Sequence, residues 1–343
     1  MRISDDIGFG INKSINDKGE KVAFPSVVIE RINNKNRSAT SFLGGQEDDY
    51  SVVIWEENKP QESQSIYIGD AALSEGAIRT WEDDASKNDN LIPIIVTSCA
   101  ILGDNTDIDL ILGLPLDFYS DEVVEDLKKK LKNINKIVKI AGIKGTKRVK
   151  INSVSVFPQG VGAYYSIALN LDGHIKNAEF LKASGAIIDI GYRTIDYLVM
   201  SKGKKGLKVR NNLSGSEELG IKKIYEKLQN NTEARIGKKI SISKIEQAII
   251  WNNGKLEMGM EDIDLKNDYE DICSKHAKDI ISFIKFKWQD ELDYIKNIGI
   301  AGGGSKVLRQ YLKESFKNIV FLDEYANTYG YLAYQALSDR RNV

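Results

Sequence analysis

The sequence predicts an α/β protein with two domains, and three observations support this expectation. The chain has 343 residues, more than one small core usually holds, so we expect two domains or one domain with insertions. Buried-type strands alternate with helical patterns, as where the apolar run at 109–119 precedes a segment with apolar positions at helical spacing. Each half of the chain contains a similar strand–turn–strand segment, one within 1–32 and one at 185–201.

The first half of the chain is predicted to consist mainly of strands. Residues 1–32 contain a strand, a glycine turn, a second strand and the segment VAFPSVVIE, which is typical of a hairpin that opens a sheet. Residues 33–90 are rich in Asn, Ser, Gln and acids, and we expect an inserted subdomain of strands and a short helix there. The strand at 109–119 ends in a segment with Gly and Pro, and Ser120 is the expected N-cap of the next helix.

The second half is predicted to alternate strands with longer helices. After SVFPQG, residues 161–171 can form a helix, and 185–201 form a second strand–turn–strand segment. The remaining predicted elements are helices at 214–229 and 264–290, a strand, glycine loop and helix at 296–312, and a last helix at 324–337.

Charge and composition argue against several classes of function. Lys and Arg total 48 against 49 Asp and Glu, so the net charge is −1 and no overall field favours nucleic acid or an anionic membrane. The N-terminus has no basic region before a long apolar stretch, and no window of about 18 apolar residues occurs, so we expect a soluble cytoplasmic protein. Cys99 and Cys273 form no paired pattern, which favours reduced, buried thiols over a disulfide.

The two histidines, His174 and His276, leave little material for a Ser-His-Asp triad or a histidine-rich metal site. Cys273 and His276 lie three residues apart on one predicted helical stripe. Metal ligation by this pair is conceivable, but a packed helix face explains the spacing better.

Three segments combine an apolar strand with a glycine turn and polar residues: DDIGFGINK (5–13), DIGYRTID (189–196) and GIAGGGSK (299–306). A triphosphate needs backbone N–H groups that approach it closely, which glycine permits, and its divalent cation needs oxygen ligands such as Asp. One such hairpin is usually only a turn, but two with the same Asp-x-Gly opening and a triple glycine favour a nucleotide site. None of the three matches the Walker or GxGxxG pattern.

These segments resemble, in order, the phosphate 1, phosphate 2 and adenosine motifs of the actin, Hsp70 and sugar kinase superfamily. FPSVV, GLPLDFY, FPQG and YANTYGYLAY look like the ParM-type bacterial actins that segregate plasmids. The resemblance implies a two-domain actin-like (ribonuclease H-like) fold with the nucleotide in the interdomain cleft. It also implies the domain boundaries: domain I at 1–170 with the insert at 33–90, domain II at 171–324 with an insert at 210–285, and a C-terminal helix at 325–343 that returns to domain I.

The resemblance further implies roles for individual residues. Gln159, at the strand-to-helix junction before phosphate 2, would position the attacking water, while Asp6 and Asp189 would hold Mg²⁺ through waters. Lys13 would contact the β- and γ-phosphates, and the helix start at 214–220 would approach the nucleoside. The other predicted nucleotide contacts are Gly8, Phe9, Gly10 and Asn12 in the first loop, Gly191, Tyr192, Arg193, Thr194 and Asp196 in the second, and Gly302, Gly303, Gly304 and Ser305 beside the α-phosphate and sugar.

Three points remain open at this level. Phosphate 2 usually carries a second glycine or small residue and a Ser or Thr where Tyr192 and Arg193 stand, so Arg193 either reaches a phosphate or points outward. Asp5 lies next to Asp6, and the spacing to the glycines favours Asp6 as the metal-facing acid. Gln159 could instead cap the following helix or face solvent.

We therefore expect a filament-forming ATPase that uses ATP, or GTP, with Mg²⁺. Its partners would be further copies of itself and an adaptor protein bound to a centromere-like plasmid site, without direct DNA or membrane binding. A small-molecule kinase of the same superfamily is one alternative, but it needs a carboxylate base where Gln159 stands. A non-polymerising scaffold clamped by nucleotide is the other, and pelleting with ATP separates both from a filament.

Overall fold

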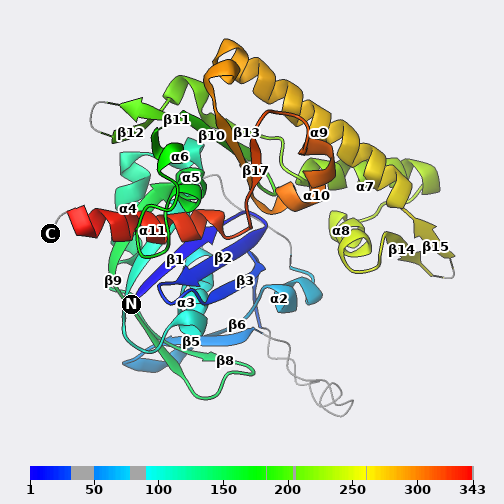
Figure 1. The fold of residues 1–343 in the computed structure, drawn as a ribbon. Helices are drawn as coiled ribbons and strands as arrows, with labels where there is room; N and C mark the ends of the chain where they lie inside the picture. Colours follow the sequence, from blue (N-terminus) through cyan, green and yellow to red (C-terminus); the bar gives the residue numbers. More distant parts are fainter. Residues whose placement is uncertain (32–49, 78–89, 183, 204–205, 260, 342–343) are drawn as a thin grey trace. The chain divides into compact units, whose positions relative to one another are not determined.

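The computed structural model of the chain describes residues 1–31, 50–77, 90–182, 184–203, 206–259 and 261–341 (Figure 1). The chain divides into two compact units, Met1–Lys176 with Asn327–Val343, and Asn177–Ala326. Among the described residues, no helix is both long enough and apolar enough to cross a membrane. Parts of the insert predicted at 33–90, residues 33–49 and 78–89, lie outside the described residues.

Unit 1 is built on one mixed sheet in which the described strands have the order β3-β2-β1-β7-β9-β8-β5-β6-β4. The predicted N-terminal hairpin is present as β1 and β2, and β1, β7 and β9 run parallel to one another. The strands are β1 (Arg2–Ile7), β2 (Ile11–Asn16), β3 (Lys21–Pro25), β4 (Val28–Glu30), β5 (Ser51–Glu56), β6 (Lys59–Ile68), β7 (Asp107–Leu114), β8 (Asn135–Ile140) and β9 (Lys147–Pro158). The two strands β5 and β6, from the predicted insert, extend this same sheet rather than forming a separate one.

Helices cover both faces of the unit 1 sheet. α3 (Leu91–Leu102) is buried almost all round and packs against β1, β2 and β3, as expected for a helix with apolar residues on every side. α4 (Asp121–Leu131) begins at the predicted cap, where the Ser120 hydroxyl accepts a hydrogen bond from the Val123 amide at 3.3 Å. The shorter elements are α2 (Asp70–Ser74), α5 (Val161–Ala168) and the 3₁₀ turn η3 (Leu116–Phe118).

The last helix, α11 (Ala326–Arg341), packs on the face opposite α3 through aromatic rings. Tyr331 is buried and stacks on Phe157, with ring centroids 5.5 Å apart. A Cβ at Gly162 would collide with the Tyr331 ring, and a Cβ at Gly330 would overlap the carbonyl oxygen of Gly162. These glycines therefore let the start of α11 approach α5 closely.

Unit 2 contains a second sheet, in which the described strands have the order β12-β11-β10-β16-β17, with β13 also paired to β11. The second predicted hairpin is present as β10 and β11, and β16 runs parallel to β10. The strands are β10 (Gly185–Ile190), β11 (Ile195–Gly203), β12 (Gly206–Val209), β13 (Gly215–Glu217), β16 (Asn297–Ala301) and β17 (Ile319–Phe321).

The three helices predicted in unit 2 are present, one of them with a correction, and α6 and α8 were not predicted. The helix predicted at 214–229 begins only at Lys222, because residues 215–217 pair with β11 and the Ser214 hydroxyl accepts a hydrogen bond from the Val199 amide. The helices are α6 (Ala178–Lys182), α7 (Lys222–Ile236), α8 (Ile242–Ile250), α9 (Lys266–Trp288) and α10 (Gly303–Leu312), with the hairpin β14 (Lys255–Met258) and β15 (Glu261–Asp264) and the 3₁₀ turns η4 (Asn211–Leu213) and η5 (Gln289–Tyr294).

Candidate functional site

Three side chains from distant parts of the sequence meet at the end of β1 in unit 1. The Gln159 Nε2 donates a hydrogen bond to the Asp6 Oδ1 at 2.6 Å, and the Asn327 Nδ2 donates to the Asp6 Oδ2 at 3.3 Å. All three residues are buried. Both oxygens of the Asp6 carboxylate are therefore held by side-chain amides, which restricts its orientation.

Parallel pairing explains why Asp6 and Gln159 meet. β1, β7 and β9 end at the same edge of the sheet, where ligands of open α/β sheets usually bind. β9 ends at Pro158, and the Gln159 amide donates to the Leu114 carbonyl oxygen at 2.6 Å. Gly160 then takes a φ of 83°, which favours glycine and turns the chain into α5. Gln159 is thus fixed at the junction between a strand and a helix, and it does not face solvent.

Asn327 was not predicted as a site residue. Its Oδ1 accepts hydrogen bonds from the Gly160 amide at 3.1 Å and the Ala163 amide at 3.0 Å, so it caps α5 from a position 167 residues further along the chain. The same side chain contacts Asp6 through its Nδ2. Asn327 therefore links the start of α11 to Asp6 and to the first turn of α5, which directly follows Gln159.

The strand alternation separates Asp6 from Asp5 and Asn12. Asp6 lies opposite Lys13 on the α11 face, whereas Asp5 and Asn12 point toward α3. The Ser14 hydroxyl donates to the Asp5 Oδ1 at 2.8 Å, and the Asn12 Nδ2 donates to the Ser98 hydroxyl at 2.7 Å. Burial raises the pKa of the Asp5 carboxyl to about 7. The side chains of Asp5 and Asn12 thus belong to the interior under α3 and do not join the Asp6 cluster.

The loop between β1 and β2 contains the predicted Gly8, Phe9 and Gly10. The Ser26 hydroxyl donates to the Gly8 carbonyl oxygen at 2.6 Å, and the Ser26 amide donates to the Gly10 carbonyl oxygen at 3.0 Å. The Phe9 ring packs edge-on against Phe118, with centroids 6.4 Å apart. Ser26 directly follows β3. Its two hydrogen bonds therefore hold the Gly8 and Gly10 carbonyl groups of this loop in place.

Lys13 is nine-tenths buried on the Asp6 face of the sheet. Among the described residues, no hydrogen bond or ion pair reaches its Nζ. A buried ammonium without a partner is costly, so the protein gains when an anion binds beside it. This position fits the predicted phosphate contact.

The second hairpin and the triple glycine come together in unit 2. Asp189, in β10, pairs with Asp196 of the antiparallel strand β11. On its other side it pairs with Ala301, the last residue of the parallel strand β16. Gly302 follows with a φ of 81°, and a Cβ there would overlap the Asp189 carboxylate and the Ile190 carbonyl oxygen. Two separately predicted segments are thus adjacent, and the backbone at Gly302 reaches Asp189 only because it has no side chain.

The turn from Gly191 to Thr194 is tied to the helices that follow it. The Gly191 amide donates to the Thr194 carbonyl oxygen at 2.9 Å. The Tyr192 hydroxyl donates to the Glu246 carboxylate in α8, and the Arg193 Nη2 donates to the Glu218 Oε1 at 3.1 Å. Arg193 therefore forms an ion pair with Glu218, and Tyr192, which stands where a small residue is usual, anchors the turn to α8.

The triple glycine is mostly the first turn of α10 rather than a loop. Gly302 precedes the helix, and the Ser305 hydroxyl donates to the Gly302 carbonyl oxygen at 2.7 Å. A Cβ at Gly304 would meet Ile190 and Ile221, whereas no atom lies within 4 Å of a Cβ placed at Gly303. Gly303 is therefore the member of the three that leaves room for a ligand.

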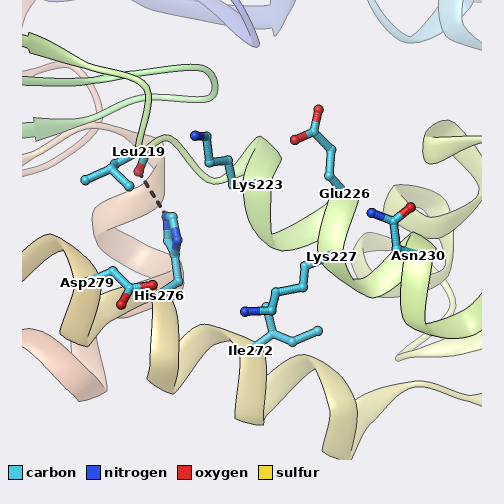
Figure 2. A pocket seen from close by; sticks show the side chains of 8 residues that line it. All are labelled: Leu219, Lys223, Glu226, Lys227, Asn230, Ile272, His276 and Asp279. Atoms are coloured by element: carbon cyan, nitrogen blue, oxygen red, sulfur yellow. Dashed lines mark hydrogen bonds between the residues drawn. The ribbon is translucent and has the colours of Figure 1, made fainter.

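A cavity of about 350 Å³ lies between α7 and α9 (Figure 2). Leu219 in its lining belongs to the segment 214–220 that was predicted to approach the nucleoside, and the other predicted site residues do not line it. The lining residues are Leu219, Lys223, Glu226, Lys227, Asn230, Ile272, His276 and Asp279. The His276 Nε2 lies 3.0 Å from the Leu219 carbonyl oxygen, and burial lowers the pKa of this imidazole. Cys273 is buried on the same helix, and burial raises the pKa of its thiol to about 11. Cys273 and His276 are thus both buried on one face of α9.

Comparison with known proteins identifies related domains in both units. The family model described as "Actin like proteins N terminal domain" matches residues 5–162, and "Archaeal actin homologue MreB-like, C-terminal" matches residues 187–314. No curated protein matches the sequence.

Solved structures share the fold over nearly the whole chain. A non-polymerisable quadruple mutant of pCBH ParM has 24% identity, covers 97% of this chain and 98% of its own, and has a TM-score of 0.79. A 15-stranded ParM filament from Clostridium botulinum has 23% identity over the same shares and a TM-score of 0.80. An archaeal actin homologue in complex with ADP has 18% identity, covers 99% of both chains and has a TM-score of 0.73. The predicted two-domain actin-like fold is confirmed.

Proposed function

This chain belongs to the actin-like proteins, and we propose that it is a filament-forming ATPase that binds ATP or GTP with Mg²⁺ in the cytoplasm. The observation that carries this proposal is the buried cluster of Asp6, Gln159 and Asn327 beside the unpaired Lys13. A carboxylate, an oriented amide and an ammonium at one sheet edge are the groups that phosphoryl transfer to water requires. The relative with bound ADP supports a nucleotide as the ligand.

In this proposal Gln159 orients the attacking water. Because its Nε2 donates to Asp6, its Oε1 is the end of the amide that can accept a hydrogen bond from water. An amide is a poor base, so its contribution is orientation rather than proton removal. We expect hydrolysis to be slow for the same reason.

Asp6 and Asp189 are the proposed ligands of Mg²⁺, through waters, and carboxylate oxygens suit this hard cation. When bound, the ion neutralises the charge that develops on the phosphates. Lys13 and the backbone of the two glycine turns, at Gly8–Gly10 and at Gly191, would bind the phosphates, and Phe9 lies in the first of these turns. The start of α10, from Gly302 to Ser305, would bind the α-phosphate and sugar through helix N–H groups.

Assembly and cargo form the second part of the proposal. Two of the similar structures are a ParM filament and a non-polymerisable ParM mutant, which supports self-association of this chain. The net charge of −1 gives no general attraction to DNA, so we propose that an adaptor protein at a centromere-like plasmid site connects the filament to its cargo.

Light scattering and pelleting test this function. Wild-type protein with ATP, GTP, ADP or a non-hydrolysable analogue should assemble with a triphosphate and pellet, and phosphate release should follow. Gln159→Ala should lower phosphate release at least about tenfold while nucleotide still binds, and Gln64→Ala, an exposed glutamine in β6, should change neither. A protein that stays in the supernatant and phosphorylates a small molecule would be a kinase, and one that binds nucleotide without either activity would be a scaffold.

A further inference from the structure

The side chain of Tyr192 connects the phosphate 2 turn, which runs from Gly191 to Thr194 between β10 and β11, to a distant helix. Its hydroxyl donates a hydrogen bond to the Oε1 of Glu246, which lies in the middle of α8 and 54 residues further along the chain. Glu246 is only 5% exposed, so its carboxylate lies in the interior of unit 2. A hydrogen bond to a carboxylate is strong, and burial strengthens it further.

The backbone of the same turn is bound by the start of α7. Three successive carbonyl groups of the turn accept hydrogen bonds from three successive amides at the opening of this helix. The pairs are Gly191 with Ile221 at 3.2 Å, Tyr192 with Lys222 at 2.8 Å, and Arg193 with Gly220 at 3.0 Å. The first amides of a helix have no partner within it, so the turn serves as the cap of α7. The same bonds hold the turn against the helix.

These bonds also orient the N–H groups of the turn. A trans peptide group is planar, and its C=O and N–H point in opposite directions. Because the three carbonyl groups point toward α7, the N–H groups of the same peptide units point away from it. They belong to Tyr192, Arg193 and Thr194. Successive N–H groups on one side of a turn form a concave site for an anion, so the position of the turn decides where this site faces.

α7 and α8 are fixed to each other, so the turn is attached at two points to one rigid pair of helices. The Gln229 Nε2 donates to the Ile240 carbonyl oxygen at 2.6 Å, and the Ile240 amide donates to the Glu233 Oε1 at 2.8 Å. Ile245 and Ala248 are buried on the inner face of α8. The distance between the start of α7 and the middle of α8 is therefore restricted.

We propose that Glu246 is a positioning residue for the nucleotide reaction, because through the Tyr192 hydroxyl it holds the phosphate 2 turn where its N–H groups face the phosphates. This rests on the proposed function, which assigns phosphates to the turn. The three backbone bonds lead to one segment, so alone they let the turn swing about that segment, and the bond to α8 removes this freedom. Misplacement of a binding group by about 1 Å can lower a reaction rate about 100-fold.

The hydrogen bond can be removed from either side. Tyr192→Phe deletes only the hydroxyl, Glu246→Leu deletes the acceptor, and Glu246→Gln keeps an oxygen that accepts. The control is Tyr311→Phe, which also loses a hydroxyl bond in unit 2, to the Glu270 carbonyl oxygen. Tyr192→Phe and Glu246→Leu should each lower both the affinity for a fluorescent ADP and the kcat of phosphate release at least about tenfold. Glu246→Gln and the control should stay within about threefold of the wild type.

A double variant shows whether the two residues act through their bond. When Glu246→Leu has already removed the bond, adding Tyr192→Phe should change ADP affinity and kcat by less than about twofold. Two effects that multiply in the double variant would overturn the proposal, because each residue would then act alone. A folded Tyr192→Phe protein with the affinity and kcat of the wild type would overturn it as well.

Hydrogen exchange without nucleotide separates this inference from the proposed function. The amides at 220–222 donate to the turn, so their exchange should become at least about tenfold faster in Tyr192→Phe and Glu246→Leu and stay unchanged in Tyr311→Phe. A wild type that binds no nucleotide would refute the proposed function and the role toward phosphates, while faster exchange in the two variants would still show that Glu246 holds the turn. Unchanged exchange in both variants would refute the attachment itself.

Discussion

Alanine at two neighbouring positions of the triple glycine should have opposite effects. Gly302 has a φ of 81° and a ψ of 164°, a region that only glycine occupies without strain, and any other residue there costs about 1–3 kcal/mol. A methyl group would also overlap the Asp189 carboxylate and the Ile190 carbonyl oxygen, and such overpacking costs about 1–3 kcal/mol more. We therefore expect Gly302→Ala to lower the free energy of unfolding by about 3–5 kcal/mol.

Gly303 is the matched position. It is the first residue of α10, and no atom lies within 4 Å of a Cβ placed there. Alanine is the better helix former, so Gly303→Ala should leave the free energy of unfolding unchanged or raise it by about 0.5 kcal/mol. If the open space at Gly303 receives the nucleotide, the added methyl should lower nucleotide affinity at least about tenfold.

The assay combines urea unfolding without nucleotide, followed by circular dichroism, with titration of a fluorescent ADP. Gly302→Ala should lower the free energy of unfolding, whereas Gly303→Ala should leave it nearly unchanged and lower the nucleotide affinity. A Gly302→Ala protein as stable as the wild type would refute the backbone argument. Unchanged affinity in a folded Gly303→Ala protein would refute the placement of the nucleotide at the start of α10.

Three further predictions use the same measurements. Asn327→Ala should lower the free energy of unfolding by about 3 kcal/mol, because two buried amides of α5 and one carboxylate lose their partner, whereas the exposed cap Asn177→Ala should cost at most about 1 kcal/mol. Lys13→Met should raise the free energy of unfolding without nucleotide by about 1 kcal/mol and weaken nucleotide binding at least about tenfold. The raised pKa of Asp5, about 7, means that the native state binds one more proton than the unfolded chain between pH 4 and 7. Wild-type stability should therefore fall by about 4 kcal/mol as the pH rises through this window, and Asp5→Asn should remove that dependence.

The features that the sequence predicted correctly are local ones. Both glycine hairpins were predicted from a strand, a turn and a strand within about 15 residues, and both are confirmed. The cap at Ser120 is also local, and its hydrogen bond to Val123 is present. Strand alternation is equally short-range, and it places Asp6, and not Asp5, beside Gln159. The role of Asp6 as a metal ligand stays a prediction.

Non-local pairing explains what the sequence did not predict correctly. Residues 215–217 have no strong strand pattern, and they form β13 only because β11 offers an edge to pair with, so the helix predicted from 214 was wrong in its first turns. Asn327 caps a helix that begins more than 160 residues earlier, and no spacing rule connects the two. Its only signal was an Asn near the start of a predicted helix, which is common in any sequence.

The choice of glutamine at position 159 follows from its neighbour. A glutamate there would place a second carboxylate at hydrogen-bond distance from Asp6, and two carboxylates so close cannot both stay ionised. The amide instead donates to the Asp6 Oδ1 at 2.6 Å without adding a second negative charge beside it. Because Asn327 holds the other carboxylate oxygen and also the amides behind Gln159, any displacement of α11 alters both residues together. The last helix therefore sets the geometry of the strand-to-helix junction at which the hydrolysis is proposed to occur.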